Sequence, residues 1–151
     1  MAPKNCQLVP EEMTDAYYYL WVGIGCQRGT SCEFISAAIK HVFQQNNLFE
    51  SAITGVATIN TKANETGLIE YCSALNLPLV FFSTEQLQNI YVPNPSQIVA
   101  SKVQTLSVAE AAAMIAASVD TLYVSKQIIR SVQNLKGTVT LAVAYSTTLK
   151  T

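Results

Sequence analysis

Charged residues are scarce in this chain: they make up 13% of its 151 residues, against 50% for apolar residues. The 9 Lys and Arg and the 10 Asp and Glu leave a net charge of −1, and the cations are scattered rather than gathered in a stripe. Because nucleic-acid binding needs clustered cations that neutralise phosphates, the sequence argues against a nucleic-acid partner. A chain this lean in charge must bury a large share of its apolar side chains or expose some of them to a partner.

Long apolar runs are also missing, since no stretch approaches the roughly 18 residues that a membrane-spanning helix needs. The first residues show no charged segment followed by an apolar one, which is the pattern of a secretory signal. From these two absences we expect a cytosolic protein with no membrane partner.

Histidine occurs once, and none of the 4 cysteines stands in C-x-x-C spacing. These absences argue against a zinc site, and we predict no metal, no cofactor and reduced thiols. Cys26 stands out among the cysteines, because a thiol at a helix N-terminus can have a lowered pKa. The simpler interpretation of Cys26 is a small residue packed in a turn.

What the sequence does contain is an alternation of strand patterns with helix patterns. Consecutive apolar and β-branched residues predict strands over residues 18–24, 53–59, 77–82, 122–125 and 138–145. Helical spacing predicts helices after Thr30, over 62–76, over 84–87, from Ser96 through Val99 and from Ser107 to about Ser118. Two capping boxes mark helix starts, with Thr30 and Ser107 as the predicted N-caps and Glu33 and Glu110 as their partners.

This alternation predicts a single α/β domain, a three-layer α/β/α sandwich in which helices cover both faces of a largely parallel or mixed sheet. The strands at 122–125 and 138–145 can pair in parallel or antiparallel, and the pattern does not decide between them. Residues 1–15 carry two prolines and little periodicity, so we predict a flexible arm there and a domain over residues 16–151.

The most informative local feature is the turn that joins the first strand to the first helix. Gly23, Gly25 and Gly29 let backbone N–H groups approach a ligand, and Arg28 adds a full positive charge beside a helix N-terminus. The turn is therefore a candidate anion site, although glycine-rich connectors of this kind are also common without a ligand. Its G-x-G-x-x-x-G spacing matches neither the dinucleotide fingerprint nor the P-loop.

Several segments, taken together in their order and spacing, resemble one known family. They are residues 22–31, 55–59, 62 with 65 and 67–68, 77–82, 92–96, 107–111, and 122–126 followed by 139–144. The resemblance is to the C-terminal domain of the cobalamin-biosynthesis protein CbiG and its stand-alone relative CobE, and it implies an α/β/α domain that acts in corrin-ring construction. Two features depart from the family: these 151 residues resemble only the C-terminal domain of CbiG and not its two further domains, and residues 103–106 contain no glycine before the Ser-Val-x-Glu helix.

The resemblance implies a precorrin or cobalt-precorrin ligand, whose acetate and propionate groups need several anion-binding points. We expect three helix starts, at 25–31, 61–62 and 105–107, to converge on one pocket at the carboxyl ends of the strands. The candidate ligand-binding residues are Gly23, Gly25, Cys26, Arg28, Gly29, Thr30, Ser31, Lys62, Thr105, Ser107 and Lys126. Glu65 and Glu110 are candidates for an acid or base, with stabilisation of a helix start as the alternative for each.

The resemblance therefore favours a protein that holds a precorrin, or that completes a truncated CbiG and so partners other cobalamin-biosynthesis enzymes. One alternative is an independent hydrolase that opens the ring-A lactone, as full-length CbiG does with release of acetaldehyde. The lack of a nucleophile–histidine pair argues against covalent catalysis by the chain alone. A second alternative is a nucleotide- or phosphate-binding module that uses the glycine turn. The sequence leaves the oligomeric state open.

Overall fold

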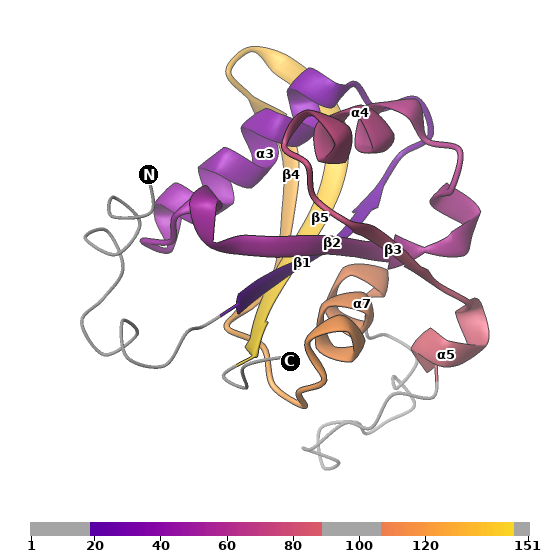
Figure 1. Cartoon of the computed structure of the whole chain (residues 1–151). Helices are drawn as coiled ribbons and strands as arrows, with labels where there is room; N and C mark the ends of the chain where they lie inside the picture. Colours follow the sequence, from indigo (N-terminus) through magenta and orange to yellow (C-terminus); the bar gives the residue numbers. More distant parts are fainter. Residues whose placement is uncertain (1–18, 89–106, 147–151) are drawn as a thin grey trace.

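The computed structural model describes residues 19–88 and 107–146 (Figure 1). Five strands and four α-helices make up most of this part of the chain. The strands are β1 (Tyr19–Cys26), β2 (Ile53–Ile59), β3 (Leu79–Phe82), β4 (Val124–Val132) and β5 (Leu135–Ser146). The α-helices are α3 (Cys32–Gln45), α4 (Thr66–Ala74), α5 (Thr84–Gln88) and α7 (Val108–Ala117), and two 3₁₀ turns are η1 (Glu50–Ala52) and η2 (Asn60–Lys62).

All five strands form one sheet in the order β3-β2-β1-β5-β4. The strands β1, β2 and β3 run parallel, whereas β5 lies antiparallel to both β1 and β4. The prediction of an α/β fold with a mixed central sheet is therefore confirmed. The question that the pattern left open is also answered, because the last two strands form an antiparallel hairpin.

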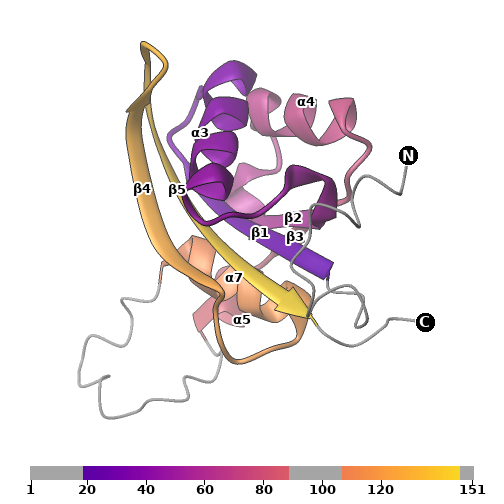
Figure 2. The same ribbon diagram turned by 90° about the vertical axis from the view of Figure 1, so that its left-hand side faces the viewer.

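The helices lie on both faces of this sheet, as the alternation predicted (Figures 1 and 2). The helices α3 and α4 pack against each other on one face, where α3 also contacts β4 and β5. On the other face α7 covers β1, β2 and β5, and α5 packs against α7. Within the described residues no helix is long and apolar enough to cross a membrane.

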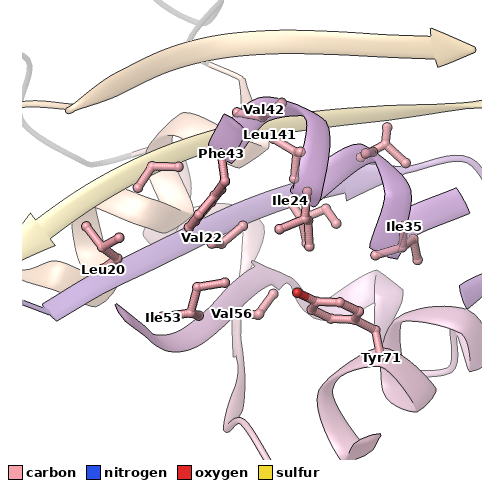
Figure 3. Close-up of a cluster of buried hydrophobic side chains, with 14 of the residues drawn as sticks. Leu20, Val22, Ile24, Ile35, Val42, Phe43, Ile53, Val56, Tyr71 and Leu141 are labelled. Atoms are coloured by element: carbon pink, nitrogen blue, oxygen red, sulfur yellow. The ribbon is translucent and has the colours of Figure 1, made fainter. Parts of the chain in front are cut away.

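The larger part of the core fills the space between the sheet and α3 (Figure 3). Side chains of β1, β2 and β5 meet those of α3 there, and Tyr71 reaches in from α4. The opposite face carries a thinner layer, since α7 supplies mainly alanines such as Ala112 and Ala113. Gly23 of β1 belongs to this close contact, because a Cβ there would collide with the carbonyl group of Ala109. Gly23 therefore serves helix-to-sheet packing.

Several predicted helix boundaries need correction. Thr30 is not the N-cap of α3; Ser31 is, and its hydroxyl accepts the N–H of Phe34 at 3.0 Å. The predicted helix over 62–76 begins only at Thr66, because residues 60–62 form a separate 3₁₀ turn. The second capping box is confirmed, since the side chains of Ser107 and Glu110 bond each other's backbone N–H groups.

The strand predictions differ in accuracy. Strand β2 matches its predicted bounds, and β3 begins two residues later than predicted. The hairpin is much longer than predicted, since β4 continues to Val132 and β5 already starts at Leu135. The predicted arm at 1–15, the predicted helix at 96–99 and residue Thr105 lie outside the described residues.

Candidate functional site

A cavity of about 730 Å³ opens between the N-terminal ends of α3 and α4, beyond the carboxyl ends of the parallel strands β1 and β2. Its walls come from the β1–α3 turn, the β2–α4 connection and the first turns of both helices. The lining residues are Arg28, Gly29, Thr30, Ser31, Cys32, Glu33, Thr61, Asn64, Glu65, Thr66, Gly67 and Glu70. This is the edge of an α/β sheet at which ligands usually bind.

The β1–α3 turn is held in shape by its own hydrogen bonds. Gly29 has a φ of +82°, which glycine adopts without strain. The buried Thr30 hydroxyl donates to the carbonyl of Gln27 at 2.6 Å, and the N–H of Gln27 donates to the carbonyl of Thr138 on β5 at 3.1 Å. Thr30 therefore shapes the turn, while Ser31 next to it caps the helix.

Gly67 brings the two helix starts together. A Cβ at this position would meet the carbonyl oxygen of Thr30 and the backbone nitrogen of Cys32, so the first turn of α4 lies directly against the start of α3. Each helix start carries free N–H groups and a partial positive charge. The packing at Gly67 thus places two positive helix ends on one cavity.

Glu65 is the buried charged residue of this cavity, with 8% of its surface exposed. Its Oε1 accepts the N–H of Gly29 at 3.0 Å, across 36 positions of sequence. Glu65 is also the N-cap residue of α4, but its side chain makes no capping hydrogen bond. The expectation that Glu65 sits in the first turn of a helix is therefore corrected: its carboxylate bridges two loops.

The remaining charges around the cavity have mixed signs. Arg28 is exposed and takes part in no ion pair within residues 19–88 and 107–146. Glu33 and Glu70 are exposed carboxylates on the rims of α3 and α4. Lys62 does not line the cavity, although it lies close enough to Cys26 to influence its pKa. Arg28 is thus the cation that the cavity itself presents to a ligand.

The cysteines next to the cavity are not activated thiols. Burial raises the pKa of Cys26 above its ordinary value and outweighs the opposing effects of Lys62 and of the hydrogen bond with Thr30. Burial also raises the pKa of Cys32, with a further rise from the carboxylates Glu70 and Glu33. The lowered pKa expected for a thiol at a helix N-terminus is therefore not found at Cys26, which is partly buried at the end of β1.

Three predicted site residues lie away from this cavity: Ser107 and Glu110 at the start of α7, on the other face of the sheet, and Lys126 on β4. Glu110 bonds Ser107 through Oε1, and its Oε2 accepts the N–H of Lys126 on β4 at 3.0 Å. Both carboxylate oxygens of Glu110 are thus occupied: Oε1 closes the cap of α7, and Oε2 joins α7 to β4. Gly25 faces open space, since a Cβ there would meet nothing within 4 Å.

The structure therefore gathers part of the predicted site and separates the rest. Arg28, Gly29, Thr30, Ser31 and Glu65 line one cavity. Lys62, Ser107, Glu110 and Lys126 do not line it. Some lining residues were not among the predicted site residues. Gly67 could have been predicted from the sequence, because it belongs to the segments that carry the family resemblance, whereas nothing in the sequence marked Asn64 and Thr66.

Comparison with known proteins assigns the family. The model of the family described as "Cobalamin synthesis G C-terminus" matches residues 20–144, so the chain belongs to this family. A cobalt-precorrin-5A hydrolase of Priestia megaterium is 31% identical over 125 residues, which cover 83% of this chain and 32% of the hydrolase. The chain thus spans about a third of the length of that relative.

Two further relatives are comparable to this chain in length. A protein named CobE from Sinorhizobium sp is 25% identical over 120 residues and matches 78% of each chain. The crystal structure of a CobE, described as a protein from the cobalamin biosynthetic pathway, superimposes with a TM-score of 0.67 at 25% identity, over 87% of this chain and 96% of that one. The chain is therefore a cobalamin-biosynthesis protein related to the CbiG C-terminal domain and to CobE.

Proposed function

We propose that this protein binds a precorrin or cobalt-precorrin and that the cavity between α3 and α4 receives a peripheral carboxylate of the macrocycle. The observation that carries this proposal is Arg28, an exposed cation without an ion-pair partner in the described residues, at the mouth of a cavity formed by two helix starts. A carboxylate seated there gains a charge-assisted hydrogen bond from Arg28 and the field of both helix ends.

The cavity suits the edge of a tetrapyrrole rather than the whole ring. Its walls carry hydroxyl, amide and carboxylate side chains and contain no large apolar residue against which a macrocycle face could lie flat. The acetate and propionate groups project from the rim of the ring. Binding by the rim therefore matches the chemistry of this cavity.

Spectroscopic titration with a series of precorrins tests this proposal. The tetrapyrrole absorbance should shift on binding, and Arg28→Ala should weaken the affinity by about 10- to 100-fold, the loss expected for one charged hydrogen bond. Arg130→Ala is the matched control, because it removes the same side chain from an exposed position on β4. Equal affinities for wild type and Arg28→Ala would refute the proposal.

A second candidate function is completion of a hydrolase that lacks this domain. The lengths of the relatives favour this role, because the chain matches about one third of the hydrolase but most of CobE. In that role Glu65 is the candidate acid or base at the lactone, since it is a buried carboxylate in the cavity wall. Glu110 is a weaker candidate, because one of its oxygens bonds Ser107 in the cap of α7 and the other bonds Lys126 on β4.

Independent hydrolysis receives less support from the geometry. The single histidine of the chain is exposed on α3 and does not line the cavity. We also propose a cytosolic location, which fits the free thiols of Cys26, Cys32 and Cys72.

A further inference from the structure

The β1–α3 turn already holds a carboxylate that belongs to the chain itself. Glu65 reaches across the cavity wall, and its Oε1 accepts the N–H of Gly29 at 3.0 Å. This N–H belongs to the turn in which the proposed ligand carboxylate would be received. The turn that we propose to receive a ligand carboxylate thus already donates a hydrogen bond to a carboxylate of the chain itself.

The burial of Glu65 makes the hydrogen bond from Gly29 costly to lose. The residue is more than nine-tenths buried, and no Lys or Arg of the described residues lies within ion-pair distance of its carboxylate. A buried charge without a counter-ion depends on the hydrogen bonds that it receives. Gly29 supplies the hydrogen bond that holds Glu65 in this position.

We propose that Glu65 is a resident occupant of the anion position, and that a ligand carboxylate binds by displacing it from Gly29. The inference rests on the proposed function and adds a competition between the protein's own carboxylate and that of the ligand. In the free protein Glu65 then occupies the N–H of Gly29, and only a ligand that also engages Arg28 gains enough to displace it.

The start of α4 provides a second position for the displaced carboxylate. Glu65 is the N-cap residue of α4, and its side chain makes no capping hydrogen bond in this structure. An N-cap side chain can accept the N–H of the second or third helical residue, which here are Gly67 and Leu68. The side chain can therefore exchange the N–H of Gly29 for an N–H of its own helix.

Displacement predicts an unusual sign for a mutation in a binding site. Glu65→Gln keeps the size of the side chain, removes its charge and weakens its hold on Gly29. Uroporphyrin, a stable tetrapyrrole with eight carboxylates, should then bind about fivefold more tightly or better, the factor expected when the bond to be displaced is a neutral hydrogen bond instead of a charge-assisted one. Absorbance titration measures this affinity, and circular dichroism checks that the variant is folded.

Glu70→Gln is the matched control. Glu70 lines the same cavity and loses the same charge, but it has no hydrogen bond to the turn. We expect Glu70→Gln to tighten binding clearly less than Glu65→Gln. Equal gains in the two variants would overturn the inference, because they would assign the effect to the overall charge of the cavity.

The amide signal of Gly29 gives an independent readout. Glu65→Ala and saturation of the wild type with uroporphyrin should both shift this signal, since each removes the Glu65 hydrogen bond. A Gly29 signal unchanged by bound uroporphyrin would overturn the inference, as would weaker or equal binding by Glu65→Gln. If neither the wild type nor Glu65→Gln binds uroporphyrin, the proposed function fails and the inference fails with it. Binding that is lost in Arg28→Ala but not strengthened in Glu65→Gln refutes the inference alone.

Discussion

At the scale of single residues, Thr58 joins the two strands that lead to the cavity. It is fully buried, and its hydroxyl donates to the carbonyl of Ile24 on β1 at 2.6 Å. Thr58→Val keeps the shape of the side chain but removes the donor and leaves a buried carbonyl with one bond fewer. We expect the free energy of unfolding to fall by about 1–2 kcal/mol.

Urea denaturation measures this change. Thr61→Val is the control, because Thr61 is exposed at the rim of the cavity and the same substitution there should change the stability by less than about 0.5 kcal/mol. Equal losses in both variants would show that the hydroxyl of Thr58 contributes nothing particular.

The raised pKa values of Cys72 and Tyr71 predict how the free energy of unfolding changes at alkaline pH. Burial raises the pKa of Cys72 from 9.0 to about 11, and burial together with Glu50 raises that of Tyr71. Between pH 9 and 11 the folded chain therefore retains a proton on Cys72 that the unfolded chain has lost. Below pH 9 the ionisation of Cys72 does not reduce the free energy of unfolding. As the pH rises towards 11, the free energy of unfolding falls by up to about 2 kcal/mol because of Cys72.

Denaturation curves between pH 8 and 11 test this expectation. Cys72→Ala lowers stability at every pH because it leaves a cavity in the core, but its stability should fall less steeply with pH than that of the wild type. Parallel pH profiles of the two proteins would contradict a raised pKa at Cys72.

At the scale of elements, the hairpin shows what the sequence signals missed. Gln133 and Asn134 connect β4 to β5 with φ values of +53° and +66°, as in a tight hairpin turn of two residues. The usual signature of that turn ends in glycine, and its absence here concealed the hairpin. The exposed polar residues of β4 concealed its continuation beyond Ser125, since this strand lies at the edge of the sheet.

Asn134→Gly should therefore stabilise the hairpin. Glycine adopts a positive φ more easily than asparagine, so we expect a gain of about 0.5–1 kcal/mol and a rise in Tm of a few degrees. Ser131→Gly, in the extended backbone of β4, should lower Tm instead. Thermal melts of both variants settle the matter, and a lower Tm for Asn134→Gly would show that the side chain of Asn134 contributes more than the backbone strain costs.

The two capped helix starts also differ in whether the sequence predicts the N-cap residue. The box of Ser107 and Glu110 was predictable because only one residue of the right kind precedes the apolar pattern. At α3, Thr30 and Ser31 are adjacent candidates for the N-cap. Ser31 is the N-cap because the Thr30 hydroxyl donates to the carbonyl of Gln27 instead. This long-range shape of the turn, fixed by β5, has no local sequence signal.

At the scale of the whole molecule, chain direction explains why the three predicted helix starts do not share one cavity. The chain moves from β1 to β2 to β3 in one direction across the sheet, then returns past β1 to β4. Right-handed crossovers place helices on opposite faces when the direction reverses. The starts of α3 and α4 therefore lie together, and Ser107 at the start of α7 lies across the sheet. The sequence predicted the layers but not the strand order on which this division depends.

The match of most of the chain to about one third of the hydrolase also gives a test of the complementation role. If this domain completes a shorter hydrolase, then a Priestia megaterium cobalt-precorrin-5A hydrolase from which the matched third has been deleted should regain activity when this chain is added. Two separate chains lack the millimolar effective concentration that a covalent link provides, so the recovered activity should rise with the concentration of added chain and then saturate. Arg28→Ala should lower the recovered activity and Arg130→Ala should not, because only Arg28 lines the cavity. Lactone opening is followed by the absorbance of the macrocycle and by released acetaldehyde. Activity that stays at the level of the deleted hydrolase at every concentration of added chain would contradict complementation and leave precorrin binding as the function to pursue.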